Sequence, residues 1–111
     1  MSQIVPVILV MNDEYWLPYS LSSIAGYFNR YIIYNIGSKD NTENIIDWFV
    51  EKEKHTGASF YVRHLPFVDP VIQGIFRNSM IAEAQSDWYF IVDGDEVYTK
   101  ESMEKLISYE E

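Results

Sequence analysis

A cluster of acidic side chains follows a strongly apolar run in the last quarter of the chain. Tyr89–Val92 has the composition of a buried strand, and Asp93, Asp95 and Glu96 come directly after it. Carboxylates held close together repel each other, and one takes up a proton unless a cation lies between them. Oxygen ligands suit Mg²⁺ or Mn²⁺, which keep several waters and take further ligands from substrate phosphates. These acids therefore indicate a site for a divalent metal and a phosphorylated ligand.

The same segment permits a simpler interpretation. Asp93 followed by Gly94 between two β-prone runs is a signature of a tight β-hairpin, in which the acids would only be solvated. A calcium-binding EF-hand loop is not expected, because Val97 and Tyr98 stand where that loop needs a ligand and a glycine. The sequence therefore leaves the metal site and the hairpin as the two interpretations of this segment.

A second polar segment, NIGSKDNT at residues 35–42, also follows an apolar run. Gly37 allows a tight turn, and Ser38 and Asp40 have side chains that cap helices. The segment lacks the Lys-Ser/Thr ending of a phosphate-binding P-loop and the G-x-G-x-x-G spacing of a dinucleotide site. It is therefore typical of a strand-to-helix turn, and neither of those nucleotide sites is expected here.

Four apolar runs alternate with four helical patterns along the chain. We expect strands at residues 4–11, 31–34, 59–63 and 88–92, and helices at residues 15–28, 40–54, 71–84 and 99–108. The helices should bury apolar side chains that include Trp48 and Ile75. This alternation predicts an α/β fold, with an open, mainly parallel sheet and helices on both faces. The polar residues that follow the strands should then meet at one edge of the sheet, where such folds bind ligands.

The composition suits a single domain spanning residues 1–111. Of these 111 residues 48% are hydrophobic and none is cysteine, so the chain can bury a core without disulfides. The formal net charge of −9 argues against nucleic acid and anionic lipid as partners. The longest apolar run, residues 5–11, is too short to span a bilayer, and no N-terminal segment looks like a signal peptide. We therefore expect a cytoplasmic protein without a transmembrane segment.

Four segments, in order along the chain, resemble the motifs of family 2 glycosyltransferases of the GT-A fold. They are VILVMNDEYWL with an Asn-Glu-like turn, IIYNIGSKDNT close to Asp-x-Gly-Ser-x-Asp-x-Thr, GIFRNSMIAEA with Arg-Asn, and DWYFIVDGDE with Asp-x-Asp. The last segment is also similar to a branch related to lipopolysaccharide-core glucosyltransferases. The resemblance spans almost the whole chain but only the front half of a usual family domain. It implies a donor-binding half-domain shortened after the Asp-x-Asp strand, with the catalytic base expected beyond residue 111.

The resemblance also implies a ligand and a role for each matching residue. The half-domain would bind a nucleotide diphosphate sugar, a UDP-sugar being favoured, with Mn²⁺ or Mg²⁺. The sugar would pass to a hydroxyl of an acceptor saccharide or lipid-linked glycan. Asp95 and Asp93 would hold the metal, and Asp93 would also approach the ribose or the sugar. Asn35 stands where an aspartate usually contacts the base, and Arg77 would lie near the nucleotide or diphosphate. The rest of the pocket would be shaped by Asn12, Glu14, Gly37, Ser38 and Asp40.

Other functions remain open at this point. A chain with only the donor half could be a non-catalytic nucleotide-sugar or protein interaction module. A response-regulator-like receiver is also doubly wound, acidic and Mg²⁺-binding, but it needs an aspartate after the third strand, where RHLPF supplies none. A half-domain would leave strand edges and apolar surface uncovered, so self-association is expected.

Overall fold

The structure, a computed structural model, describes residues 3–66 and 69–109. The strands are β1 (Val5–Val10), β2 (Arg30–Ile36), β3 (Ser59–Leu65) and β4 (Tyr89–Asp93). The helices are α1 (Leu17–Ile24), α2 (Thr42–Glu53), the short 3₁₀ helix η1 (Lys54–Thr56), α3 (Pro70–Ala84) and α4 (Lys100–Ser108). The strands form one sheet in the order β3-β2-β1-β4, and each neighbouring pair is parallel. The predicted α/β fold is therefore confirmed.

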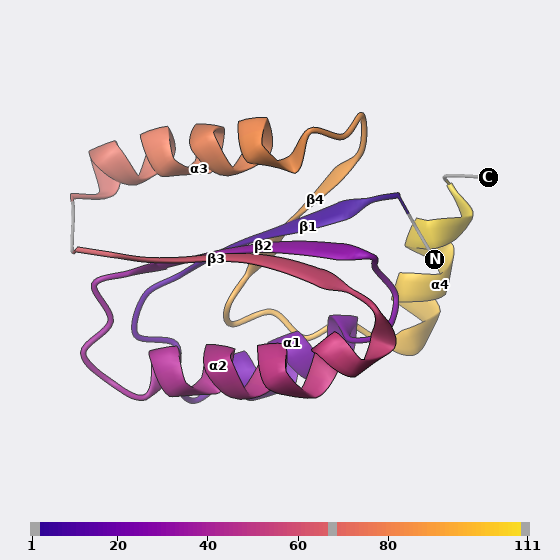
Figure 1. The fold of residues 1–111 in the computed structure, drawn as a ribbon, viewed down its shortest axis with the longest axis horizontal. Coiled ribbons are helices and arrows are strands. Elements are labelled where there is room, and N and C mark those ends of the chain that lie inside the picture. The colour runs from indigo at the N-terminus through magenta and orange to yellow at the C-terminus, as the bar shows by residue number, and fades with distance from the viewer. Residues whose placement is uncertain (1–2, 67–68, 110–111) are drawn as a thin grey trace.

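Different helices cover the two faces of the sheet. Figure 1 shows α1 and α2 on one face and α3 on the other. The first face buries a core that includes Ile8, Val10, Leu17, Leu21, Ile24, Tyr31, Ile33, Ile46, Phe49 and, from α4, Met103. The second face buries Val5, Val7, Ile32, Tyr34, Met80 and Ala84. Because β1 and β2 are covered on both faces, their sequences read as unbroken apolar runs rather than alternating ones.

Several sequence-based details differ from the structure. The first helix is shorter than residues 15–28, because Ala25 leaves the helical conformation with ψ at 140°. Trp48 and Ile75 were expected to be buried, but they are 47% and 64% exposed. Ile46 and Phe49 of α2, and Met80 and Ala84 of α3, follow the helical period toward the sheet. Trp48 and Ile75 do not keep that period within their helices, so they point away from the sheet. The loop expected between Pro66 and Pro70 includes residues 67–68, which lie outside the described residues.

The order of the strands places a crevice beside β1 and β4. The chain moves outward from β1 to β2 and β3, then returns through α3 to place β4 on the other side of β1. The strand order reverses between β1 and β4, and α/β proteins bind ligands beyond the carboxyl ends of the strands at such a switch point. β4 pairs in parallel with β1 and leads to α4, so the hairpin interpretation of the acidic segment is wrong. No helix within residues 3–66 and 69–109 has the length and apolar character needed to cross a membrane.

At the amino ends of the strands, the side chain of Arg30 in β2 holds the C-terminal end of α3. Its guanidinium donates hydrogen bonds to the carbonyl oxygens of Ala84 at 2.8 Å and Glu83 at 2.9 Å. The last carbonyls of a helix have no partner within the helix, and the C-terminal end of the helix dipole attracts a cation. Arg30 therefore supplies both the hydrogen bonds and the charge that α3 needs at this end.

We expect Arg30→Met to lower the free energy of unfolding by about 1–3 kcal/mol, the range for hydrogen bonds to a charged donor. Methionine keeps the apolar stem but cannot donate to the two carbonyls. Urea denaturation measures the change. The matched control is Lys54→Met, which removes an exposed cation whose Nζ lies 2.8 Å from the Glu51 carboxylate, and it should leave the unfolding midpoint almost unchanged. Equal effects of the two substitutions would show that Arg30 does not fasten α3.

Candidate functional site

The acidic loop, residues 93–98, turns sharply where β4 ends. The backbone N–H of Glu96 donates to the carbonyl oxygen of Asp93 at 3.1 Å. Two serines of α1 hold the loop at both ends: Ser20 Oγ donates to the Asp93 carbonyl oxygen at 3.3 Å, and Ser23 Oγ accepts from the N–H of Tyr98 at 3.1 Å. The acidic loop is therefore a turn that α1 anchors at both ends.

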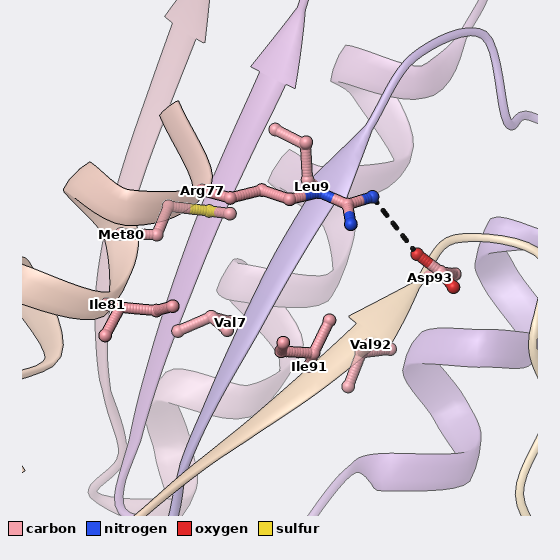
Figure 2. Close-up of a pocket in the computed structure, with 8 residues that line it drawn as sticks. All are labelled: Val7, Leu9, Arg77, Met80, Ile81, Ile91, Val92 and Asp93. Atoms are coloured by element: carbon pink, nitrogen blue, oxygen red, sulfur yellow. Dashed lines mark ion pairs between the residues drawn. The ribbon is translucent and has the colours of Figure 1, made fainter. Parts of the chain in front are cut away.

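Arg77 of α3 and Asp93 at the end of β4 form an ion pair. Arg77 Nη2 lies 3.7 Å from Asp93 Oδ1, and both side chains are about half exposed. Figure 2 shows the guanidinium reaching from α3 over Leu9 toward the end of β4. Apolar side chains line the small pocket beside this ion pair, namely Val7, Leu9, Met80, Ile81, Ile91 and Val92. The structure thus brings together a cation and an acid that the sequence had placed 16 residues apart.

Asp13 is a site candidate to which the sequence assigned no role. Its Oδ2 accepts a hydrogen bond from the N–H of Met11 at 3.1 Å, and the carboxylate packs directly against Gly94 of the acidic loop. Burial raises the pKa of Asp13, and the negative charges of Asp95, Asp40 and Asp93 raise it further, against the lowering effect of the Met11 hydrogen bond. Asp13 therefore lies between the acids after β4 and those after β2.

The turns after β1 and β2 are joined by hydrogen bonds that we call the loop clamp, made by residues 12–14 and 38–42. The N–H of Asn12 donates to Ser38 Oγ at 3.0 Å, and Asn12 Oδ1 accepts from the N–H of Lys39 at 2.8 Å. Asn12 has a positive φ of 53°, a conformation that asparagine adopts more readily than most residues. The predicted pocket residues Asn12 and Ser38 thus lie together, and they bind one loop to the other.

Acidic side chains complete the loop clamp. Asp40 Oδ2 accepts from the N–H of Glu14 at 3.3 Å, and Glu14 Oε2 accepts from the N–H of Asn41 at 3.1 Å. Asp40 Oδ1 also accepts from the N–H of Thr42, the first residue of α2, at 2.9 Å, whereas the N-cap position itself belongs to Asn41. Burial alone would raise the pKa of Asp40, but the hydrogen bonds from Thr42 and Glu14 outweigh it and lower the pKa.

Asn35 lies buried near the carboxyl end of β2. Only 3% of the residue is exposed. Its Oδ1 accepts from the hydroxyl of Ser38, and its Nδ2 lies 3.2 Å from His64 Nδ1. Gly37, with φ at 58°, turns the chain and donates its N–H to the carbonyl oxygen of Leu65 at 2.6 Å. Every residue expected after β1, β2 and β4 therefore lies at the same edge of the sheet.

Comparison with known proteins agrees with this geometry. The sequence pattern of the family described as Glycosyl transferase family 2 matches residues 6–110. The chain belongs to glycosyl transferase family 2. The SPbeta prophage-derived glycosyltransferase SunS of Bacillus subtilis (strain 168) and glycosyltransferase SunS of Bacillus phage SPbeta are each 28% identical to it over 104 residues, covering 89% of this chain and 21% of the relative. The chain thus spans about a fifth of the length of the curated relatives it matches.

The acids of this family 2 chain fit a hydrated divalent ion better than a closed metal cage. In the part of the chain that the structure describes, no three His, Cys, Asp or Glu side chains are grouped as ligands of one ion. Mg²⁺ needs only one or two carboxylates when waters and phosphates supply the rest. Burial, with the charges of Glu96, Asp93 and Asp95, raises the pKa of Tyr98 to about 12. A bound cation would offset the negative charges of this loop.

The raised pKa of Asp13 predicts a stability effect that depends on pH. Because folding raises the pKa above its ordinary 3.8, the ionised carboxylate costs stability at neutral pH, and the cost disappears as pH falls through the folded-state pKa. Asparagine keeps an acceptor for the Met11 N–H without the charge. We therefore expect Asp13→Asn to unfold at a higher urea concentration than the wild type at about pH 7, with the two converging at about pH 3. An advantage that grows toward acid pH would contradict this account.

Proposed function

We propose that this chain binds a nucleotide diphosphate sugar together with Mn²⁺ or Mg²⁺ at the edge of the sheet where β1 and β4 end. It would act as the donor-binding half of an enzyme that transfers the sugar to an acceptor hydroxyl. The observation that carries the proposal is the meeting of Arg77, Asp93, Asp95 and Asp13 at the switch point of a family 2 chain.

The arrangement suggests how charge would be divided in the complex. Asp95 is exposed and Asp93 faces Arg77 at 3.7 Å, so both carboxylates are accessible to a hydrated ion. A bound metal would neutralise charge that builds on the leaving diphosphate. Once Asp93 turns to that ion, the Arg77 guanidinium is released and can pair with a phosphate oxygen, which its planar fork suits. Arg77 would therefore give up its ion pair with Asp93 and form one with a phosphate of the ligand.

The loop clamp would give the donor pocket its shape. Asn12, Glu14, Ser38 and Asp40 use their polar atoms to join the two turns, so their contribution is to hold Asn35 and Gly37 in place beside the ligand. We propose a UDP-sugar as donor and a saccharide or lipid-linked glycan as acceptor. The cytoplasmic location expected from the sequence stays a prediction.

One observation favours a second function, a non-catalytic nucleotide-sugar or protein interaction module. The side chains that the family resemblance assigns to the pocket are largely occupied by the loop clamp, which would preserve the fold without catalysis. Incubation with UDP-glucose, Mn²⁺ and a set of acceptor saccharides separates the two, with release of UDP as the readout. Sugar transfer by the chain would rule out the non-catalytic module.

Calorimetric titration tests the proposed function. UDP and GDP are each titrated into the chain with Mn²⁺ and again with the metal removed by a chelator. We expect heat of binding for UDP only when Mn²⁺ is present, because the metal links the diphosphate to the carboxylates. Absence of binding by either nucleotide in the presence of Mn²⁺ would reject nucleotide binding by this chain.

Self-association is expected through the exposed edge and face of β4. In the described sheet β4 pairs only with β1, and Ile91 on its α3-facing side is 48% exposed. An uncovered edge strand with apolar side chains is a template for pairing with another chain. Sedimentation of the wild type should show a mass that rises with concentration, and Ile91→Lys should shift it toward the monomer. A monomeric wild type across the whole concentration range would contradict the expectation.

A further inference from the structure

A chain of hydrogen bonds crosses the carboxyl ends of β2 and β3. It runs from the N–H of Asn12 to Ser38 Oγ at 3.0 Å, and from the Ser38 hydroxyl to Asn35 Oδ1. It continues from Asn35 Nδ2 to His64 Nδ1 at 3.2 Å. Asn35 and His64 are direct partners in the parallel register of β2 and β3, so their side chains share the face that α2 covers. The imidazole is therefore the last member of the chain that also contains the loop clamp.

The direction of these bonds fixes the proton position on the imidazole. Ser38 Oγ accepts from Asn12, so its own proton is free to be donated to Asn35 Oδ1. The Asn35 amide nitrogen then faces His64 Nδ1, and since an amide nitrogen only donates, Nδ1 must be the acceptor. The proton of neutral His64 is thereby assigned from the network to Nε2. One tautomer of His64 matches one orientation of the Asn35 carboxamide.

Two carboxylates of α2 face the other side of the ring. His64 Nε2 lies 3.7 Å from Glu43 Oε1 and 3.9 Å from Asp47 Oδ1. These are the charged groups that the described ion pairs place against the imidazole, and Asn35 is its polar neighbour from β2. Imidazole is the side chain whose charge changes between about pH 5 and 8.

We infer that His64 is a positioning residue whose neutral form fixes the orientation of the Asn35 carboxamide and whose protonation reverses it. With both ring nitrogens protonated, the Nδ1–H would face the amide N–H of Asn35. Asn35 is almost fully buried, so water cannot relieve this contact between two donors. We expect the carboxamide to turn, presenting Oδ1 to the ring and Nδ2 to Ser38, and Ser38 then loses its acceptor for the hydroxyl proton.

The consequence for the donor rests on the proposed function. Asn35 and Ser38 line the turn that would receive the nucleotide. Turning the Asn35 carboxamide would exchange its hydrogen-bond donor and acceptor at this turn. We therefore expect affinity for UDP with Mn²⁺ to fall by roughly threefold to tenfold between about pH 8 and pH 5.5, the effect of one hydrogen bond. The fall should be smaller by that factor in His64→Gln, whose side-chain oxygen accepts from Asn35 but does not titrate, and the remaining fall reflects protonation of the UDP phosphate, whose second pKa is about 6.

Nitrogen-15 NMR of the full chain tests the positioning role without any nucleotide. In the wild type, we expect the ring shifts of His64 to report the Nε2–H tautomer at about pH 8. The side-chain amide signals of Asn35 should move with the titration of that ring. In His64→Gln the Asn35 amide signals should stay constant over the same pH range. In His64→Leu, which offers no acceptor, they should be displaced at every pH. His55→Gln is the matched control because it removes the other histidine from η1, and it should keep the wild-type pH dependence.

The two measurements separate the inference from the proposed function. Asn35 amide signals that ignore the titration of His64, or that move in the same way in His64→Gln, would overturn the positioning role. Failure of UDP to bind at either pH rejects nucleotide binding only, because the amide signals then decide the role of His64 by themselves. UDP binding that weakens equally in the wild type and in His64→Gln would also overturn the inference.

Discussion

Asp95→Ala is expected to weaken the manganese-dependent binding of UDP by at least about 100-fold, since even the loss of an outer-shell partner can cost a metal site that much. Asp95 is the exposed member of the acid pair, whereas Asp93 lies 3.7 Å from Arg77 and has a cation beside it already. Removing Asp95 leaves one carboxylate, and that carboxylate is shared with Arg77. Calorimetry with UDP and Mn²⁺ provides the measurement.

The control must remove the same charge near the same strand without touching its carboxyl end. Asp87→Ala does so, because Asp87 precedes β4 at the other end of the strand. Each substitution changes the net charge of −9 by one unit, so long-range attraction of Mn²⁺ changes equally in both. Wild-type affinity in Asp87→Ala together with lost affinity in Asp95→Ala would identify a local metal contact. Wild-type affinity in both would mean that the acids only close the turn after β4.

Asp13 is not expected to share the metal with Asp95. Asp13 feels the charges of Asp95, Asp40 and Asp93, but its Oδ2 is held by the Met11 N–H. Its carboxylate therefore contributes negative potential, and the structure gives it no free position comparable to that of Asp95. The stability effect of Asp13→Asn and the binding effect of Asp95→Ala should consequently be separable.

The fold was accessible from the sequence because its signals are local. The β-branched run Val5–Val10 and the run around Ile32 are continuous since both faces of those strands are covered. The ends of the helices were harder to predict from the sequence. Phe28 keeps the apolar period of α1 and is fully buried, yet it lies beyond the helix because the chain leaves the helical conformation at Ala25. Periodicity reports burial, and it does not report where helical hydrogen bonding stops.

The candidate site was accessible only in part. Parallel strands bring their carboxyl ends to one edge, so the meeting of the residues after β1, β2 and β4 follows from the pattern of elements. The loop clamp could not be predicted from that pattern, because its hydrogen bonds join residues that are 26 to 29 positions apart and have ordinary turn-forming side chains. His64 lies near the carboxyl end of β3. Its contact with Asn35 depends on the register of β2 and β3, which the sequence does not specify.

Gly94→Ala is expected to lower the free energy of unfolding by about 1–3 kcal/mol, as for other additions of a methyl group to a packed position. A Cβ at Gly94 would lie 2.7 Å from Asp13 Oδ2 and 2.9 Å from Val10 Cγ1. Val10 is buried in the core and Asp13 is held by the Met11 N–H, so neither side chain can simply move aside. The acidic loop must instead move away from the end of β1, and UDP binding with Mn²⁺ should weaken with it.

Two further variants show whether close packing is the cause. Gly74→Ala makes the same change in the exposed middle of α3, where an added Cβ meets nothing within 4 Å, and it should stabilise the chain by about 1 kcal/mol through helix propensity. Asp13→Ala removes the closest obstacle, so adding it to Gly94→Ala should cost less than the sum of the two single effects. Strict additivity would mean that Gly94 is not kept small by Asp13. A double variant that loses less stability than the sum of the single variants would show that Asp13 is the reason why the Asp-x-Asp motif has a glycine at position 94.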